Sequence, residues 1–206
     1  MFRLPRGFRL AVVLATALAV VVVAVGVWSL WLRGVFAAAR ADADSRTYLS
    51  GCLDPGFTGV RDGVQIAIIT LPGSPTGWPV RQGVGGASLR DSVGWYDQTA
   101  RPGQVGNMVL VGQRLATGGP FDAILDIKTG DAITVETCQA VYTYTVRVAP
   151  SDLTVQPTDT WVMDAVPGRP AAMPSTAWLT LVANQDVLPT SDRAVGFAEL
   201  TATTAR

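Results

Sequence analysis

The chain has 206 residues with 16 basic and 16 acidic side chains, so its formal net charge is zero and gives no reason to expect a nucleic-acid partner. It contains no histidine, which excludes Ser-His-Asp and Cys-His catalysts and histidine-ligated metal sites. Two cysteines are too few for a four-cysteine zinc site, and an apolar share of 49% with 16% charged residues is too hydrophobic for a disordered chain. We therefore expect a folded protein with no metal site and no cofactor.

The first feature in chain order is an apolar stretch, Leu10–Leu32, which has 23 residues and no charge. At about 1.5 Å per residue it is long enough to cross a hydrocarbon layer of about 30 Å. Arg3, Arg6 and Arg9 precede it, and a short basic tail favours a cytoplasmic N-terminus. The sequence thus predicts a cytoplasmic tail over residues 1–9, a single-pass anchor in the cell membrane and an extracellular C-terminal domain.

Two other interpretations fit parts of this end of the chain. A signal peptide cleaved near Ala37-Ala38-Ala39 is the alternative, but the apolar core of a signal peptide usually has about 7–15 residues and this stretch is longer. Leu49-Ser50-Gly51-Cys52 resembles a lipoprotein box, but a charged segment separates it from the apolar stretch. An uncleaved, non-lipidated anchor is therefore favoured.

The anchor is followed by a segment with the composition of a stalk, residues 33–56. It begins with helix-forming residues over 35–43 and ends in Gly51, Pro55 and Gly56. The remaining residues, 57–206, are enough for one domain with its own hydrophobic core.

That domain consists of short apolar segments separated by Gly, Pro and Asp turns. The expected strands are Val64–Thr70, Val80–Val84, Ser88–Val93, Asn107–Val111, Ala132–Thr137, Val141–Ala149, Trp178–Val182 and Arg193–Leu200. Pro120–Ile127 has the apolar spacing of one or two helical turns. Many short strands with few helices predict an all-β domain, either a closed barrel or a sandwich, and periodicity alone does not choose between them.

Several motifs in this domain follow one another in a recognisable order. They are Val93-Gly94-Trp95-Tyr96, Arg101-Pro102-Gly103, the run GNMVLVGQR over Gly106–Arg114, Thr129-Gly130-Asp131, the strand LTLVAN over Leu179–Asn184, and Phe197-Ala198-Glu199-Leu200. Together they resemble the sortase family, and class E sortases best, over roughly residues 60–200. The resemblance implies a sortase-like closed β-barrel with short helices, preceded by a transmembrane helix.

Sortases are membrane-anchored cysteine transpeptidases of Gram-positive cell envelopes. A Cys thiolate attacks the Thr carbonyl of an LPxTG-like or LAxTG-like sorting signal, a His acts as the acid, and an Arg binds the substrate or the developing oxyanion. In this chain the resemblance places Gln113 at the His position, Asn184 at the Cys position and Arg193 at the Arg position. A carboxamide cannot form an acyl-enzyme and Gln does not titrate near neutral pH, so no active catalytic residue is expected.

The leading hypothesis is a sortase-fold pseudoenzyme that binds a sorting-signal-like peptide, an envelope protein or an active sortase without transpeptidation. The alternatives are a transpeptidase with an unrecognised mechanism and a purely structural extracytoplasmic domain. Gln113 and Asn184 either form a hydrogen-bonded pair, are tolerated drift in an exposed groove, or have a new catalytic role. Arg193 either clamps a peptide carbonyl or carboxylate, is solvated, or pairs with Asp186 or Asp192.

The two cysteines, Cys52 and Cys138, are each other's only intramolecular partner. Outside the membrane the compartment is oxidising, which favours a disulfide between them. The bridge would close a loop of 138 − 52 = 86 residues and contribute about 4–5 kcal/mol of stability. The alternative is that Cys138 is a free thiol, which no His is present to activate.

Overall fold

The structure, a computed structural model, describes residues 6–57, 59, 64–86, 89, 91–114, 118–186 and 190–206. It begins with one long helix, α1, over Arg6–Gly51. The strands that follow are β1 (Gln65–Thr70), β2 (Trp78–Gln82), β3 (Val93–Trp95), β4 (Gly106–Val111), β5 (Ala132–Glu136), β6 (Ala140–Val148), β7 (Thr154–Val155), β8 (Ala177–Asn184) and β9 (Arg193–Ala205). Two short 3₁₀ helices, η1 (Ile124–Asp126) and η2 (Thr160–Met163), lie between strands.

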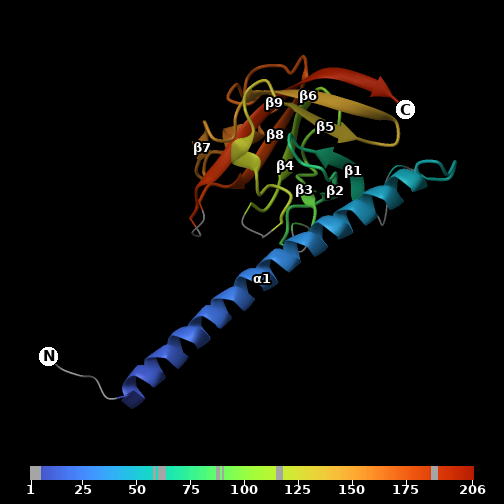
Figure 1. Ribbon diagram of the computed structural model, residues 1–206. Helices are drawn as coiled ribbons and strands as arrows, with labels where there is room; N and C mark the ends of the chain where they lie inside the picture. The colour runs from blue at the N-terminus through green and yellow to red at the C-terminus, as the bar shows by residue number, and fades with distance from the viewer. Residues whose placement is uncertain are drawn as a thin grey trace.

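The strands form a closed β-barrel (Figure 1). Their order is β6-β5-β1-β2-β3-β4-β8-β9-β7, and a further pairing between β6 and β9 closes eight of the described strands into a ring. The short strand β7 pairs with the start of β9 outside this ring. The all-β prediction is confirmed, and of the two architectures left open by the sequence the structure has the barrel.

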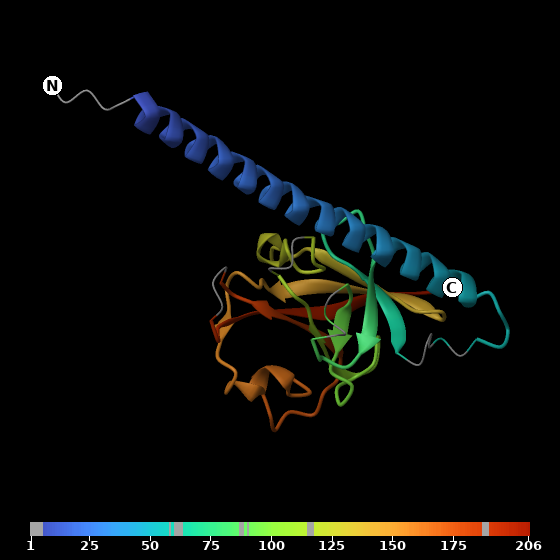
Figure 2. The same cartoon turned by 90° about the horizontal axis from the view of Figure 1, so that it is seen from below.

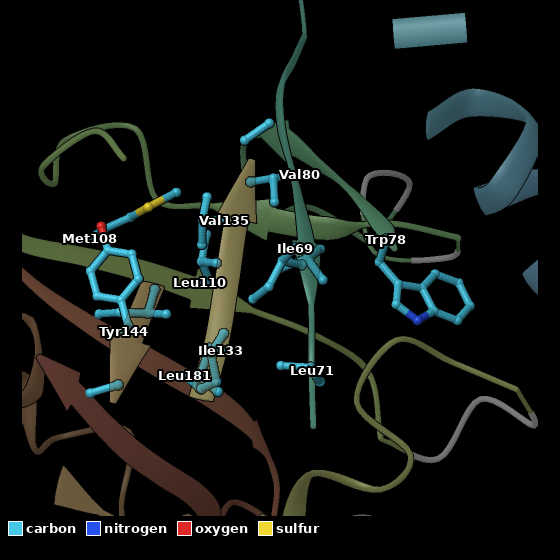
Figure 3. Packing of buried hydrophobic residues seen from close by; sticks show 14 of the residues in the cluster. Ile69, Leu71, Trp78, Val80, Met108, Leu110, Ile133, Val135, Tyr144 and Leu181 are labelled. Atoms are coloured by element: carbon cyan, nitrogen blue, oxygen red, sulfur yellow. The ribbon is translucent and has the colours of Figure 1, made fainter. Parts of the chain in front are cut away.

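The core fills the inside of the barrel. Figure 3 shows Ile69, Val80, Leu110, Ile133 and Leu181, from five different strands, among the packed side chains, and each of them is at most 2% exposed. Full burial of one such side chain contributes about 1.5–3 kcal/mol. The strand β5 alternates buried and accessible residues, as expected for a strand with one face on the core.

Four of the predicted strands differ from the structure by two residues or more at an end. The strand expected over 178–182 extends over Ala177–Asn184, and the strand that begins at Arg193 continues to Ala205. The strand expected over 80–84 lies two residues earlier, because Trp78 and Pro79 pair with Ile69 and Ile68 of β1. The strand expected over 88–93 is wrong at residues 89, 91 and 92, since β3 begins at Val93 after a turn at 89 and a bend at 91–92, and residues 88 and 90 lie outside the described part. The start of β3 is set by its pairing with both β2 and β4, which local sequence does not encode.

The helix α1 is continuous from the apolar segment into the region that the sequence presented as a stalk. Its window Val12–Ser29 has a mean hydropathy of 2.5 and lies clear of the barrel, which fits a single-pass membrane anchor. The C-terminal part of α1 lies along one side of the barrel (Figures 1 and 2). Ala41, Ser45 and Tyr48, spaced to share one helix face, are buried against it.

Polar contacts and a covalent bond hold this part of α1 in place. The Ser45 hydroxyl donates to the Gly77 carbonyl at 3.0 Å, and Arg81 forms an ion pair with Asp44 at 2.6 Å. The buried Tyr48 hydroxyl lies 2.8 Å from the Ile66 carbonyl oxygen. Just beyond the helix, a disulfide joins Cys52 to Cys138, with Cα atoms 5.1 Å apart.

Candidate functional site

Pairing between β4 and β8 brings two carboxamide residues to the same level. The strands are parallel, with Val111 opposite Val182, and the Gly112 N–H donates to the Val182 carbonyl at 3.1 Å. Gln113, two residues after the end of β4, therefore lies at the same height along the barrel axis as Asn184, the last residue of β8. These two residues are far apart in the sequence, and only the barrel makes them neighbours in register.

The third position joins them through β9. Asn184 pairs directly with Arg193, the first residue of β9, in the antiparallel register of β8 and β9. Gln113, Asn184 and Arg193 thus lie at one end of three adjacent strands, where β4 and β8 end and β9 begins. We call this end of the barrel the site end.

The two carboxamides are half-buried. Within the described part of the chain, neither the Gln113 nor the Asn184 side chain has a hydrogen-bond partner, so they do not form the bonded pair that was one of the sequence hypotheses. Each carboxamide offers both a donor and an acceptor. Because both side chains are uncharged, they are better suited to hydrogen-bonding the backbone amides of a ligand than to binding an ion.

Arg193 makes its contacts with its own loop. Its Nη1 donates to the carbonyls of Thr190, Ser191 and Asp192 at 3.1, 3.0 and 3.0 Å. The two acids considered as partners are engaged elsewhere, since the Thr190 hydroxyl donates to Asp186 and the Gln156 amide donates to Asp192. The three bonds hold the guanidinium at the start of β9 without neutralising its charge.

A second arginine, which sequence reasoning did not single out, connects the two strand ends. Arg114 lies in the segment after β4, and its Nη1 donates to the carbonyl of Gln185 in the segment after β8. Its position directly after Gln113 in the GNMVLVGQR motif was the available signal. This contact holds the residues that follow Gln113 and Asn184 together.

Asp122 organises the next described segment along the chain. Its carboxylate accepts from the Gly118 and Gly119 N–H groups at 2.6 and 2.9 Å. Burial raises the pKa of Asp122 above its usual range, against the lowering effect of those two hydrogen bonds. The Phe121 N–H donates to the Gln113 carbonyl at 3.4 Å, so this segment folds back on the site.

The two residue types that sortase chemistry uses as acid and nucleophile, His and Cys, can be accounted for over the whole chain. The sequence has no His, and both of its cysteines are joined in the disulfide. Cys138 precedes β6, whose first residue Ala140 pairs with Ala205 at the far end of β9 from Arg193. At about 3.3 Å per residue, that is about 40 Å along the strand. In the described residues no three metal-ligating side chains come together.

Comparison with known proteins decides the family. Residues 69–201, about two thirds of the chain, match the sortase domain family. The chain belongs to the sortase family. The resemblance to the sortase family inferred from the motifs is thereby confirmed, and the barrel is a sortase barrel. No curated protein matches the chain.

Solved sortases have the same fold. Sortase E from Streptomyces avermitilis is 29% identical, with a TM-score of 0.60 over 68% of this chain and 90% of that one. Sortase E1 from Streptomyces coelicolor, solved with a tripeptide in its active site, is 25% identical, with a TM-score of 0.61 over 69% and 91% of the two chains. The SrtA sortase from Actinomyces oris, 24% identical with a TM-score of 0.63 over 69% and 82%, shares the fold.

Proposed function

We propose that this sortase-family protein binds a sorting-signal-like peptide at the site end of its barrel and does not cleave it. The observation that carries the proposal is the chemistry of the three positions. The motif resemblance assigns Gln113 and Asn184 to the family's acid and nucleophile, and the chain has neither a His nor a free thiol to replace them. Class E membership and an extracellular domain are part of the same proposal.

The missing groups are the ones that transpeptidation needs. Forming an acyl-enzyme requires a nucleophile that can be activated, and a carboxamide has none. Protonating the leaving amine requires a group that titrates near neutral pH, and Gln does not. In a comparable triad, loss of the nucleophile alone lowers kcat by about 10⁶-fold, and loss of an acid–base group typically costs about 10²–10⁴-fold.

Binding, by contrast, needs only groups that are present. The free donors and acceptors of Gln113 and Asn184 match the N–H and C=O groups of an extended peptide. Arg193 uses Nη1 for its loop, which leaves Nε and Nη2 to donate to a peptide carbonyl or carboxylate. The tripeptide in the active site of sortase E1 from Streptomyces coelicolor supports a peptide as the ligand. An envelope protein or an active sortase would present such a segment as part of a larger partner.

The test uses the full chain in detergent or nanodiscs and fluorogenic LPxTG-like and LAxTG-like peptides, with and without an amine acceptor. We expect saturable binding by fluorescence anisotropy and no cleavage. Arg193→Ala should weaken binding, whereas Arg169→Ala, which removes an exposed arginine from the segment between η2 and the start of β8, should leave it unchanged. The double substitution Gln113→His with Asn184→Cys is the smallest change that should restore turnover, and either alone should restore less because the groups act as a unit.

Two outcomes would contradict the proposal in different ways. Cleavage by the native chain would favour a transpeptidase with an unrecognised mechanism. No binding of any peptide, in a preparation whose barrel is folded, would favour a purely structural domain.

A further inference from the structure

The anchor helix and the barrel touch along most of the barrel's height. Because α1 is continuous from the apolar segment to Gly51, each contact can be placed along the direction that leaves the membrane. Ala41 packs into the core nearest the membrane, the Asp44–Arg81 ion pair follows, and Tyr48 is buried farther out. The Cys52–Cys138 disulfide closes the contact at the distal end. The barrel is therefore fixed to its anchor at both ends.

These contacts also give the direction of β1. Tyr48, late in α1, meets Ile66 at the start of β1, whereas Leu71, just after β1, lines a pocket together with Ala38, which lies earlier in α1. β1 consequently runs toward the membrane as α1 runs away from it (Figure 2).

Strand pairing carries this direction around the barrel to the site. β5 is antiparallel to β1, β6 to β5, and β9 to β6, so β9 runs away from the membrane and begins at the membrane-facing end with Arg193. β8 is antiparallel to β9 and β4 is parallel to β8, so both end there. The site end is therefore the end of the barrel that faces the membrane, and the disulfide lies at the opposite end.

The distance to the membrane follows from the helix rise. Ala38 lies 38 − 32 = 6 residues beyond Leu32 and 38 − 29 = 9 residues beyond Ser29, which is about 9–14 Å beyond the hydrocarbon edge for an upright helix. The headgroup layer on each side of a bilayer takes about 5–8 Å of this. The pocket that Ala38 lines, with Pro72, Pro120 and Asp122 on its other walls, lies almost against the headgroups.

We propose that the docked anchor helix holds the site end facing the membrane, so that the site accepts a chain segment emerging from the same membrane surface. An extended chain advances about 3.3 Å per residue, so about three to four residues beyond the hydrocarbon edge bring a partner's segment to this height. The matching partner is a protein anchored in the same membrane. The orientation stands independently of the proposed function, and only the identity of the bound segment as a peptide rests on it.

The orientation is measured on the full chain in nanodiscs that contain lipids with a spin label on the headgroup. A fluorophore is attached through Thr129→Cys, in the exposed turn before β5 at the site end, or through Thr204→Cys, exposed near the distal end of β9, with the native disulfide intact. We expect several-fold stronger quenching at position 129 than at 204. Equal quenching, or stronger quenching at 204, would overturn the orientation.

A second variant tests what holds the pose. Cys52→Ser and Cys138→Ser combined with Asp44→Asn remove the bridge and the ion pair, and the difference between the two labels should shrink markedly while tryptophan fluorescence reports a folded barrel. An unchanged difference would show that these contacts do not hold the barrel. No peptide enters either measurement, so a failed orientation and a failed peptide-binding assay are distinguishable.

Discussion

Removal of the Cys52–Cys138 bridge should be the most destabilising change outside the barrel core. The disulfide spans a sequence separation of 86 residues, from the turn after α1 to the loop between β5 and β6. The chain-entropy relation then gives about 15 cal/mol/K, or about 4.6 kcal/mol at 25 °C, of stabilisation through restriction of the unfolded chain. The bridge also holds the last turns of α1 against the barrel, so its loss should release the helix end first.

The assay is urea unfolding of the full chain in detergent, followed by the fluorescence of the buried Trp78 and Trp95. At an m-value of about 2 kcal/mol per M, the midpoint of Cys52→Ser with Cys138→Ser should fall by about 2 M. The native protein treated with a reductant should show the same shift, and Ser50→Ala, an exposed change close to the bridge, should show none. A double variant that unfolds within about 1 kcal/mol of the native chain would refute this reasoning.

Further predictions concern the core. Burial raises the pKa of Tyr144 from 10.0 to about 12, so the folded state disfavours the phenolate and stability should fall as pH rises from 10 to 12. Tyr144→Phe should flatten that decline in a series of melting temperatures. Asn107→Ala should cost about 2–4 kcal/mol in urea unfolding, because its buried amide donates to two carbonyls of the η2 region. Gly112→Ala should cost about 1–3 kcal/mol, since a Cβ there would lie 2.5 Å from the Phe121 ring, whereas Gly85→Ala meets no atom within 4 Å and should be neutral.

Much of the molecule was predictable from local sequence. Buried strands such as Asn107–Val111 stand out because an uninterrupted apolar run between turn residues has few other ways to be buried. The apolar length of the anchor is likewise a property of the sequence alone. The lack of His and the single pair of cysteines are matters of composition, and they exclude His-dependent catalysis and His-ligated or four-cysteine metal sites from sequence alone. The motif order identified the sortase family, which the comparison confirmed.

Tertiary structure decided what depends on contacts between distant segments. Closure of the barrel rests on β6 pairing with β9, which no local pattern encodes because the two strands are more than 40 residues apart. The docking of α1 left no amphipathic signal, since its buried face uses Ala41, Ser45 and Tyr48, which do not form an apolar stripe. The geometry of the candidate site also depends on contacts between distant segments. Sequence supplied Gln113, Asn184 and Arg193, but strand register set their common height, and the docked helix turned that end of the barrel toward the membrane.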